Sequence, residues 1–173
     1  MIGKNLSEGL SRLLADRFVL YMKTHNFHWN VEGPMFNEHR KMFMDEYTEL
    51  WNALDPIAER IRSLGHYAPA SYKKYVQLSS ITASEKDTLN AKDMVKQLLE
   101  GHETVVKTAR DVFPLAEAGA DEATQDLLTL NLLKKVDTKN VWGIAPRKGI
   151  QYIPGVAGLC SSGSNAEQFI SDR

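Results

Sequence analysis

Residues 6–31 read LSEGLSRLLADRFVLYMKTHNFHWNV, and this stretch decides the fold. Its apolar side chains recur at steps of three and four residues, and no proline interrupts them. This period indicates a long amphipathic helix, about 40 Å in length at the usual rise of about 1.5 Å per residue. The Gly33-Pro34 pair that follows predicts where the helix ends.

Three more segments show the same helical period. One covers residues 36–64, with Pro56 as the site of a possible kink and Gly65 as a left-handed stop. A third helix is predicted over residues 91–118. A fourth begins near residue 121 and fades near residue 142.

The connection over residues 66–83 has room for one short helix. No segment alternates convincingly with a period of two, and no internal repeat is visible. Four long helices with one connection of roughly 20 residues predict an all-α protein, a four-helix bundle with a long crossover and ferritin-like topology. Glycine, serine and proline become frequent after residue 142, so we expect a bundle domain over residues 1–142 and an irregular tail over 143–173.

Composition narrows the class of protein further. The 173 residues suffice for one domain with a hydrophobic core, and a formal net charge of −1 excludes a general basic field that would attract nucleic acid or membranes. The single cysteine, Cys160, cannot form an internal disulfide, which favours a cytoplasmic setting. The amino terminus does not resemble a secretory signal, and the longest uncharged run, residues 149–166, is too broken for a membrane helix. We therefore expect a soluble protein.

Two carboxylates stand four residues apart in the second predicted helix. Asp55 and Glu59 share a helix face and repel one another, so a buried pair would require a nearby cation. Arg60, Arg62 or a metal ion could supply that charge. Alternatively, the pair is partly exposed and solvated, as such pairs often are.

Two histidines lie three residues apart near the end of the first helix. His25 and His28 share a face, and imidazoles together with carboxylates suit iron, manganese or zinc. Such pairs also arise by chance, so spacing alone leaves the metal open. A thiolate zinc site is excluded because Cys160 lies far away in the tail. His66 and His102 are interpreted as ordinary residues at helix interfaces.

The stretch YMKTHNFHWNVEGPMF, followed by YTELWNALDPIAERIRSLG, resembles the Dps family, the mini-ferritins that protect DNA during starvation. The resemblance covers roughly residues 5–129, and the two phrases are highly specific in this order and at this separation. It implies a hollow homododecamer of four-helix bundles that binds iron(II) between two-fold-related subunits. It also implies oxidation of iron by hydrogen peroxide or O2 and storage of ferric mineral in the cavity.

The resemblance assigns roles residue by residue. One subunit would supply His28 as a metal ligand, and its partner would supply the carboxylates that match Asp55 and Glu59. Trp29 would stand beside the iron and scavenge oxidising equivalents. His25 matches a frequent histidine of the motif that is usually not a primary ligand.

The sequence departs from the family at two expected ligands. Where the family has a second histidine and an acid, this chain has Arg40 and Met44. His39 and Asp45 are each displaced by one residue, which on a helix is a rotation of about 100°. Arg40 would repel iron(II), or pair with the carboxylates of a partner subunit. We therefore expect reduced ferroxidase activity, with His39 as a tentative substitute ligand.

The end of the chain also departs from the family, which carries an HEK.AWMLR-like stretch there. This chain has either a divergent fourth helix with an added tail or a reading-frame change. Asp121 and Asp126, before that point, match acids that line the pores through which iron enters in the family. Alternatively, both only cap the first turn of the fourth helix.

The amino terminus contains little positive charge, so it would neutralise few DNA phosphates. Basic residues gather near the tail instead: Lys134, Lys135, Lys139, Arg147 and Lys148. They predict either sequence-independent, salt-sensitive DNA binding and association with the nucleoid, or a solvated helix end without a partner. Two functions follow: an iron-oxidising and iron-storing enzyme, or a structural or DNA-coating shell with a degraded ferroxidase site.

Overall fold

The computed structural model describes residues 2–82 and 89–130, and within these ranges the protein is all-α, as predicted. Residues 122–130 are also helical, and no strand occurs in the described ranges. The named helices are α1 (Ile2–Asn30), α2 (Phe36–Asn52), α3 (Leu54–Ser63), α4 (Tyr72–Leu78) and α5 (Ala91–Ala118). The predictions for residues 131–142 and for the tail lie outside the described residues.

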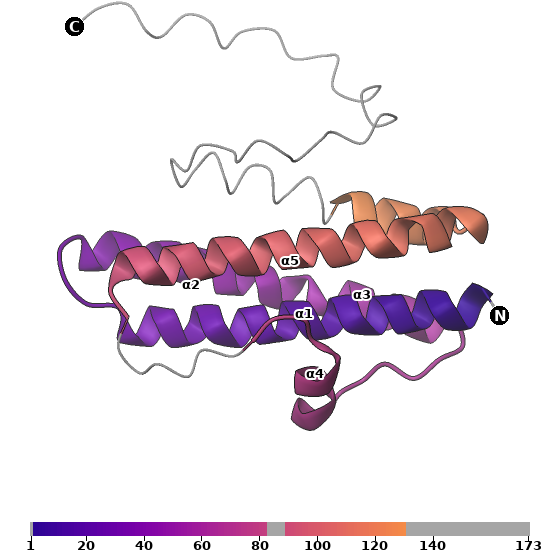
Figure 1. The fold of residues 1–173 in the computed structure, drawn as a ribbon, viewed down its shortest axis with the longest axis horizontal. Helices are drawn as coiled ribbons and strands as arrows, with labels where there is room; N and C mark the ends of the chain where they lie inside the picture. The colour runs from indigo at the N-terminus through magenta and orange to yellow at the C-terminus, as the bar shows by residue number, and fades with distance from the viewer. Residues whose placement is uncertain (1, 83–88, 131–173) are drawn as a thin grey trace, which may run out of the picture.

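Helix α1 is the central element, because it packs against α2, α3, α4 and α5. Figure 1 shows α1 and α5 side by side and antiparallel, with α2 and α3 following one another along the bundle and α4 standing off on the far side of α1. The crossover after α3 lets α5 run in the same direction as α2 and α3, as expected for the predicted bundle with one long crossover. None of the described helices is both long and apolar enough to span a membrane.

The apolar stripe of α1 builds the core. Leu10, Leu13 and Leu20 are fully buried against side chains of the other helices, and each contributes about 1.5–3 kcal/mol of transfer free energy. Gly9 lets α1 approach α5 closely, since a Cβ atom there would lie 2.8 Å from Cγ2 of Val112. The close contact of the two longest helices therefore depends on the absence of a side chain at residue 9.

The prediction of one continuous helix over residues 36–64 was wrong at one point. Helix α2 ends at Asn52 and α3 begins at Leu54, with Ala53 between them. The cause is Pro56, which has no N–H to donate and whose ring crowds the carbonyl four residues earlier, that of Asn52. The expected kink therefore appears as a break three residues before the proline.

The end of α3 confirms the predicted left-handed stop. Gly65 has a φ of 84°. Its N–H donates to the carbonyl of Arg62 at 2.9 Å, and the N–H of His66 donates to the carbonyl of Ile61 at 3.2 Å. These are the two hydrogen bonds of a Schellman motif, which favours glycine at this position.

The crossover contains one short helix, α4, as predicted. A buried carboxylate binds the residues that directly follow this helix. Asp16 is fully buried in α1. Its Oδ1 accepts hydrogen bonds from the hydroxyl of Ser79 at 2.9 Å and the N–H of Ser80 at 2.6 Å, and its Oδ2 accepts one from the hydroxyl of Thr108 at 2.6 Å. One side chain therefore joins α1, α5 and the crossover.

Candidate metal site

His28 lies in the last turn of α1 and is 7% exposed. Its Nδ1 is 2.8 Å from the carbonyl oxygen of Arg40, which can only accept. Nδ1 therefore carries the proton, and the lone pair of Nε2 is available to an electrophile. A backbone carbonyl that fixes the tautomer in this way is the usual support of a metal-binding histidine.

Aromatic rings surround this imidazole. His25 stacks on Tyr47 with ring centroids 4.2 Å apart, and it lies 4.2 Å from the ring of Trp29. Tyr47 meets His28 edge-on at 5.3 Å. Burial lowers the pKa of His25, and the neighbouring His28 lowers it further. Both effects favour the neutral form of the His25 imidazole.

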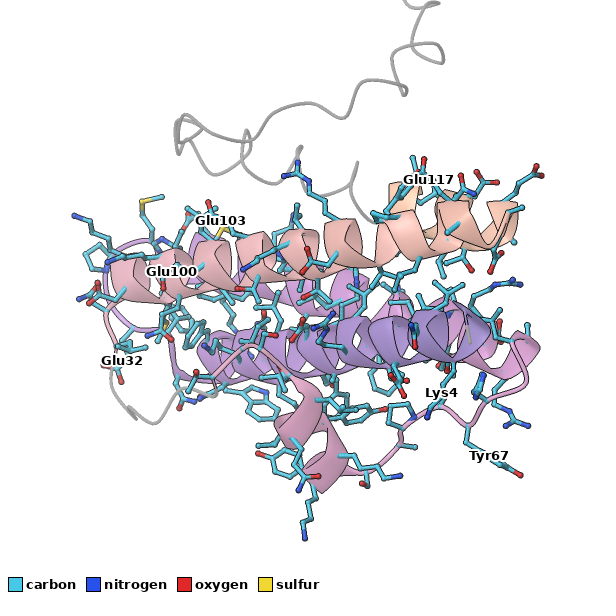
Figure 2. The ribbon with its side chains drawn as sticks, turned by 45° about the vertical axis from the view of Figure 1, so that its right-hand side comes forward. Lys4, Glu32, Tyr67, Glu100, Glu103 and Glu117 are labelled. Carbon is cyan, nitrogen blue, oxygen red and sulfur yellow. The ribbon has the colours of Figure 1, made fainter. Side chains whose placement is uncertain are left out.

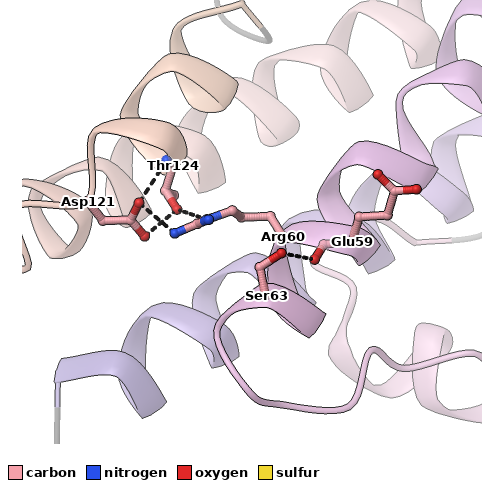
Figure 3. A network of polar contacts seen from close by, with 5 residues as sticks. All are labelled: Glu59, Arg60, Ser63, Asp121 and Thr124. Atoms are coloured by element: carbon pink, nitrogen blue, oxygen red, sulfur yellow. Dashed lines mark hydrogen bonds and ion pairs between the residues drawn. The ribbon is translucent and has the colours of Figure 1, made fainter.

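Asp55 and Glu59 lie exposed on α3. Neither forms an ion pair with a described residue, so the alternative in which Arg60 neutralises them does not occur in the protomer. Figure 3 shows the carboxylate of Glu59 directed away from the guanidinium of Arg60. Within the described ranges, no three His, Cys, Asp or Glu side chains are close enough to hold a metal ion. A single protomer therefore does not bring His28 together with these carboxylates.

Arg60 instead binds the start of the helix over residues 122–130 (Figure 3). Its Nη2 donates to Oδ1 of Asp121 at 2.7 Å, and its Nε donates to the hydroxyl of Thr124 at 2.8 Å. Burial alone would raise the pKa of Asp121, but hydrogen bonds from Arg60 and Thr124 outweigh that effect and leave the pKa below its ordinary value.

Asp121 also caps the helix over residues 122–130. Its Oδ1 accepts from the N–H of Thr124 at 3.0 Å, and its Oδ2 accepts from the hydroxyl of the same residue at 2.6 Å. Both carboxylate oxygens are thus used inside the protomer, as the capping alternative expected, whereas Asp126 is exposed. The assignment of both acids to a pore stays a prediction.

The positions that depart from the family lie on the first turns of α2. The guanidinium of Arg40 lies 5.9 Å from the ring centroid of Phe36, and Met44 is 41% exposed. His39 is half-buried and stacks on Phe43. Its Nδ1 is buried and has no hydrogen-bond partner among the described residues. The role of His39 as a substitute ligand stays a prediction.

The interior contains a charged cluster that the sequence did not reveal. Nε2 of His102 lies 2.6 Å from Oε1 of Glu46, and both side chains are almost completely buried. Arg17 is 2% exposed, and burial lowers its pKa to about 10 although Glu49 and Glu46 oppose the shift. The position of Glu46 three residues after the buried Phe43 was the one signal that it faces inward.

Other predicted residues lie outside the described ranges. These are Cys160 and the five basic residues proposed to contact DNA.

Comparisons with known proteins agree on one family. A family model described as a ferritin-like domain matches residues 7–143. The DNA protection during starvation protein 2 of Bacillus anthracis is 35% identical over 142 residues, which are 82% of this chain and 94% of the relative. The DNA protection during starvation protein of Brevibacillus brevis is 36% identical over 136 residues, which are 77% of this chain and 87% of the relative.

Among solved structures, the Dps protein of Vibrio cholerae has a TM-score of 0.77 and 28% identity to this chain. The similarity covers 82% of this chain and 90% of that one. That protein is described as a member of a broad superfamily of ferritin-like diiron-carboxylate proteins.

Proposed function

Because the chain belongs to the Dps family of ferritin-like proteins, we propose that it oxidises and stores iron and thereby protects DNA. Iron(II) binds between two subunits and is oxidised by hydrogen peroxide or O2, and the ferric product is kept as a mineral inside a homododecamer. Membership of the family supports iron storage and DNA protection in general. Which residues bind iron is proposed from the side chains of this chain.

The orientation of His28 is the observation that carries the proposal. The hydrogen bond from Nδ1 to the Arg40 carbonyl fixes the ring and leaves Nε2 as an acceptor. Nε2 forms no hydrogen bond with a described residue, so its lone pair is open to a ligand from outside the protomer. An iron(II) ion is that ligand in the proposed site.

The remaining ligands come from a second subunit. Asp55 and Glu59 are exposed on one face of α3, where their mutual repulsion favours a cation. Neither half-site has enough ligands alone, so metal binding and subunit association strengthen each other. Trp29, which is 64% exposed and touches His25, lies beside the iron in this arrangement.

The proposal extends to the path of iron and to DNA. Asp126, whose carboxylate is exposed, contributes to the pores through which iron enters, together with Asp121. The basic residues after residue 130 bind DNA without sequence preference, and the protein acts in the cytoplasm in association with the nucleoid.

A second candidate is a structural or DNA-coating shell without ferroxidase activity. Arg40 favours it, because a permanently charged guanidinium on an exposed face beside the site weakens iron(II) binding. Met44 also lacks the hard oxygen ligand that iron(II) prefers to a thioether.

Anaerobic loading of the apo-protein with iron(II), followed by peroxide, tests the proposal. We expect ferric absorbance to rise much faster than in a protein-free control, and the Glu59→Ala variant to lose this fast phase while it still assembles. Glu117→Ala is a matched control, since this exposed glutamate lies at the end of α5 and not on α3 (Figure 2). Equal rates in the wild type and Glu59→Ala contradict the assignment.

The variant Arg40→His separates the two candidates. If the wild type does not exceed the protein-free rate but Arg40→His does, the shell with a degraded site is correct. His28 keeps its orientation in this variant, because the group that it binds at residue 40 is the backbone carbonyl.

A further inference from the structure

A continuous group of rings connects His28 to a tyrosine in the middle of α1. Tyr47 lies 5.3 Å from His28 and 4.2 Å from His25, measured between ring centroids. His25 in turn lies 5.4 Å from Tyr21. The path from Tyr21 to the metal-binding imidazole therefore consists of short ring-to-ring steps, over which an electron can move readily.

Tyr21 also has a base within reach of its proton. Its hydroxyl oxygen is 3.2 Å from Nδ1 of His25, one helical turn away. Oxidation of a phenol releases its proton, and a hydrogen-bonded imidazole takes that proton as the electron leaves. Among the described residues, the hydroxyl of Tyr47 has no such hydrogen bond, and Trp29 is largely exposed to water.

The iron site requires an additional electron. Reduction of hydrogen peroxide to water takes two electrons, and one iron(II) supplies one. A guanidinium has no lone pair to offer a metal, and a thioether is a poor ligand for iron(II). With Arg40 and Met44 at the second pair of ligand positions, the proposed site offers ligands for a single iron ion in each half of the interface.

We propose that Tyr21, with His25 as its proton acceptor, donates the second electron when peroxide is reduced at the iron site. The inference rests on the proposed iron oxidation. The peroxide O–O bond breaks, iron(II) becomes iron(III), and Tyr21 becomes a neutral phenoxyl radical. Two waters form, and of the two protons that they take up, one leaves the Tyr21 hydroxyl through Nδ1 of His25 and the other comes from solvent.

The radical does not end the cycle. A second iron(II) reduces the phenoxyl radical, a proton returns to the oxygen of Tyr21, and a second iron(III) results. Two iron ions are then oxidised for each peroxide over the full cycle, although the site holds one at a time. No hydroxyl radical is released at either stage, which is the property that DNA protection requires.

Rapid-freeze electron paramagnetic resonance tests the proposal. Assembled protein is loaded anaerobically with iron(II) at less than one ion per site, mixed with peroxide, and frozen. We expect a radical signal that narrows when the protein contains ring-deuterated tyrosine, and loss of that signal in Tyr21→Phe. This substitution removes only the hydroxyl and keeps the ring contacts with Phe18 and Trp51.

Tyr67→Phe is the matched control. Tyr67 is 88% exposed, lies in the crossover and projects from the bundle (Figure 2), so its loss should leave the signal unchanged. Iron oxidation is followed in the same samples by ferric absorbance. In the first turnover with limiting iron, the wild type should consume one peroxide for each iron. Tyr21→Phe lacks the donor of the second electron, so it should oxidise its single iron more slowly.

The possible outcomes separate the inference from the function on which it rests. A tyrosyl signal of undiminished size in Tyr21→Phe overturns the inference and assigns the electron to another ring. Fast iron oxidation without any protein radical in the wild type also overturns it, but leaves the iron-oxidising function intact. Iron oxidation no faster than the protein-free control would contradict both the role of Tyr21 and the iron-oxidising function.

Discussion

The polar groups inside the bundle and those of the candidate metal site differ in where their partners lie. Inside, Glu46 pairs with His102, and Asp16 accepts three hydrogen bonds from its own protomer. At the site, His28 has one nitrogen bound and one available, while the carboxylates on α3 lie exposed. Groups that serve the fold are satisfied within the chain, and a set that is only half satisfied indicates that its remaining partners come from elsewhere.

The largest loss of stability is expected when the buried carboxylate of Glu46 is removed. Glu46→Ala removes the carboxylate beside the buried His102 and leaves the buried Arg17 with Glu49 alone. We expect it to lower the free energy of unfolding by about 3–5 kcal/mol. Urea denaturation followed by circular dichroism measures the change. A loss below 1 kcal/mol, similar to that of an ordinary surface substitution, would show that the interior cluster is not needed for stability.

Removal of Asp16 should have the next largest effect. Asp16→Ala removes the acceptor of three donors, of which Thr108 is buried, Ser79 half-buried and Ser80 exposed. We expect a loss of about 2–3 kcal/mol. Hydrogen exchange should accelerate most at Ser80 and along α4, because their attachment to α1 is lost. Uniform acceleration over the whole bundle would contradict the role of Asp16 as a specific anchor of the crossover.

The pH dependence of stability tests the contact between α3 and the helix over residues 122–130. The pKa of Asp121 is lower in the folded protein than its ordinary value. Its carboxylate therefore stabilises the fold above the unfolded pKa of about 3.9, and this contribution is lost as the pH falls through the folded pKa.

Asp121→Asn keeps a helix-capping side chain but removes the charge that binds Arg60. We expect a loss of about 1 kcal/mol at pH 7, which shrinks as the pH approaches the acid limit of folding. Urea midpoints at several pH values measure this trend. The exposed acid in Asp126→Asn provides the control, and its pH profile should match that of the wild type.

The smallest effect on stability is expected at the metal site itself. Glu59→Ala removes a like charge four residues from Asp55, so without metal it should change stability by only about 0.2–0.5 kcal/mol, in the stabilising direction. Anaerobic iron(II) should then raise the melting temperature of the wild type and not that of the variant. Equal increases in the melting temperature of both proteins would show that Glu59 is not a ligand of the iron.

The helical period predicted most of the fold, because burial against one core is what produces that period. The bounds of α5 were predicted correctly, and the stop at Gly65 follows from the local requirement for a positive φ. The break at Ala53 was missed because the proline acts on a carbonyl in the preceding turn.

The site was predicted less completely, because its decisive contacts do not depend on local sequence. The sequence suggested His28 but could not reveal that its proton lies on Nδ1, since the acceptor is a main-chain oxygen twelve positions away. The pairing of Glu46 with His102 was also hidden, because it depends on the register of α2 against α5. Arg60 was considered as a partner for the acidic pair on its own helix, whereas it binds Asp121, which follows it by 61 positions in the sequence.

The hydrogen bond between His28 and residue 40 has a consequence for how the site can change during evolution. The atom that orients His28 belongs to the backbone, which every amino acid supplies. The side chain at position 40 can therefore be exchanged without disturbing the tautomer of its neighbour. In the proposed iron site, substitutions at this position can therefore alter the affinity for metal while the orientation of His28 stays the same.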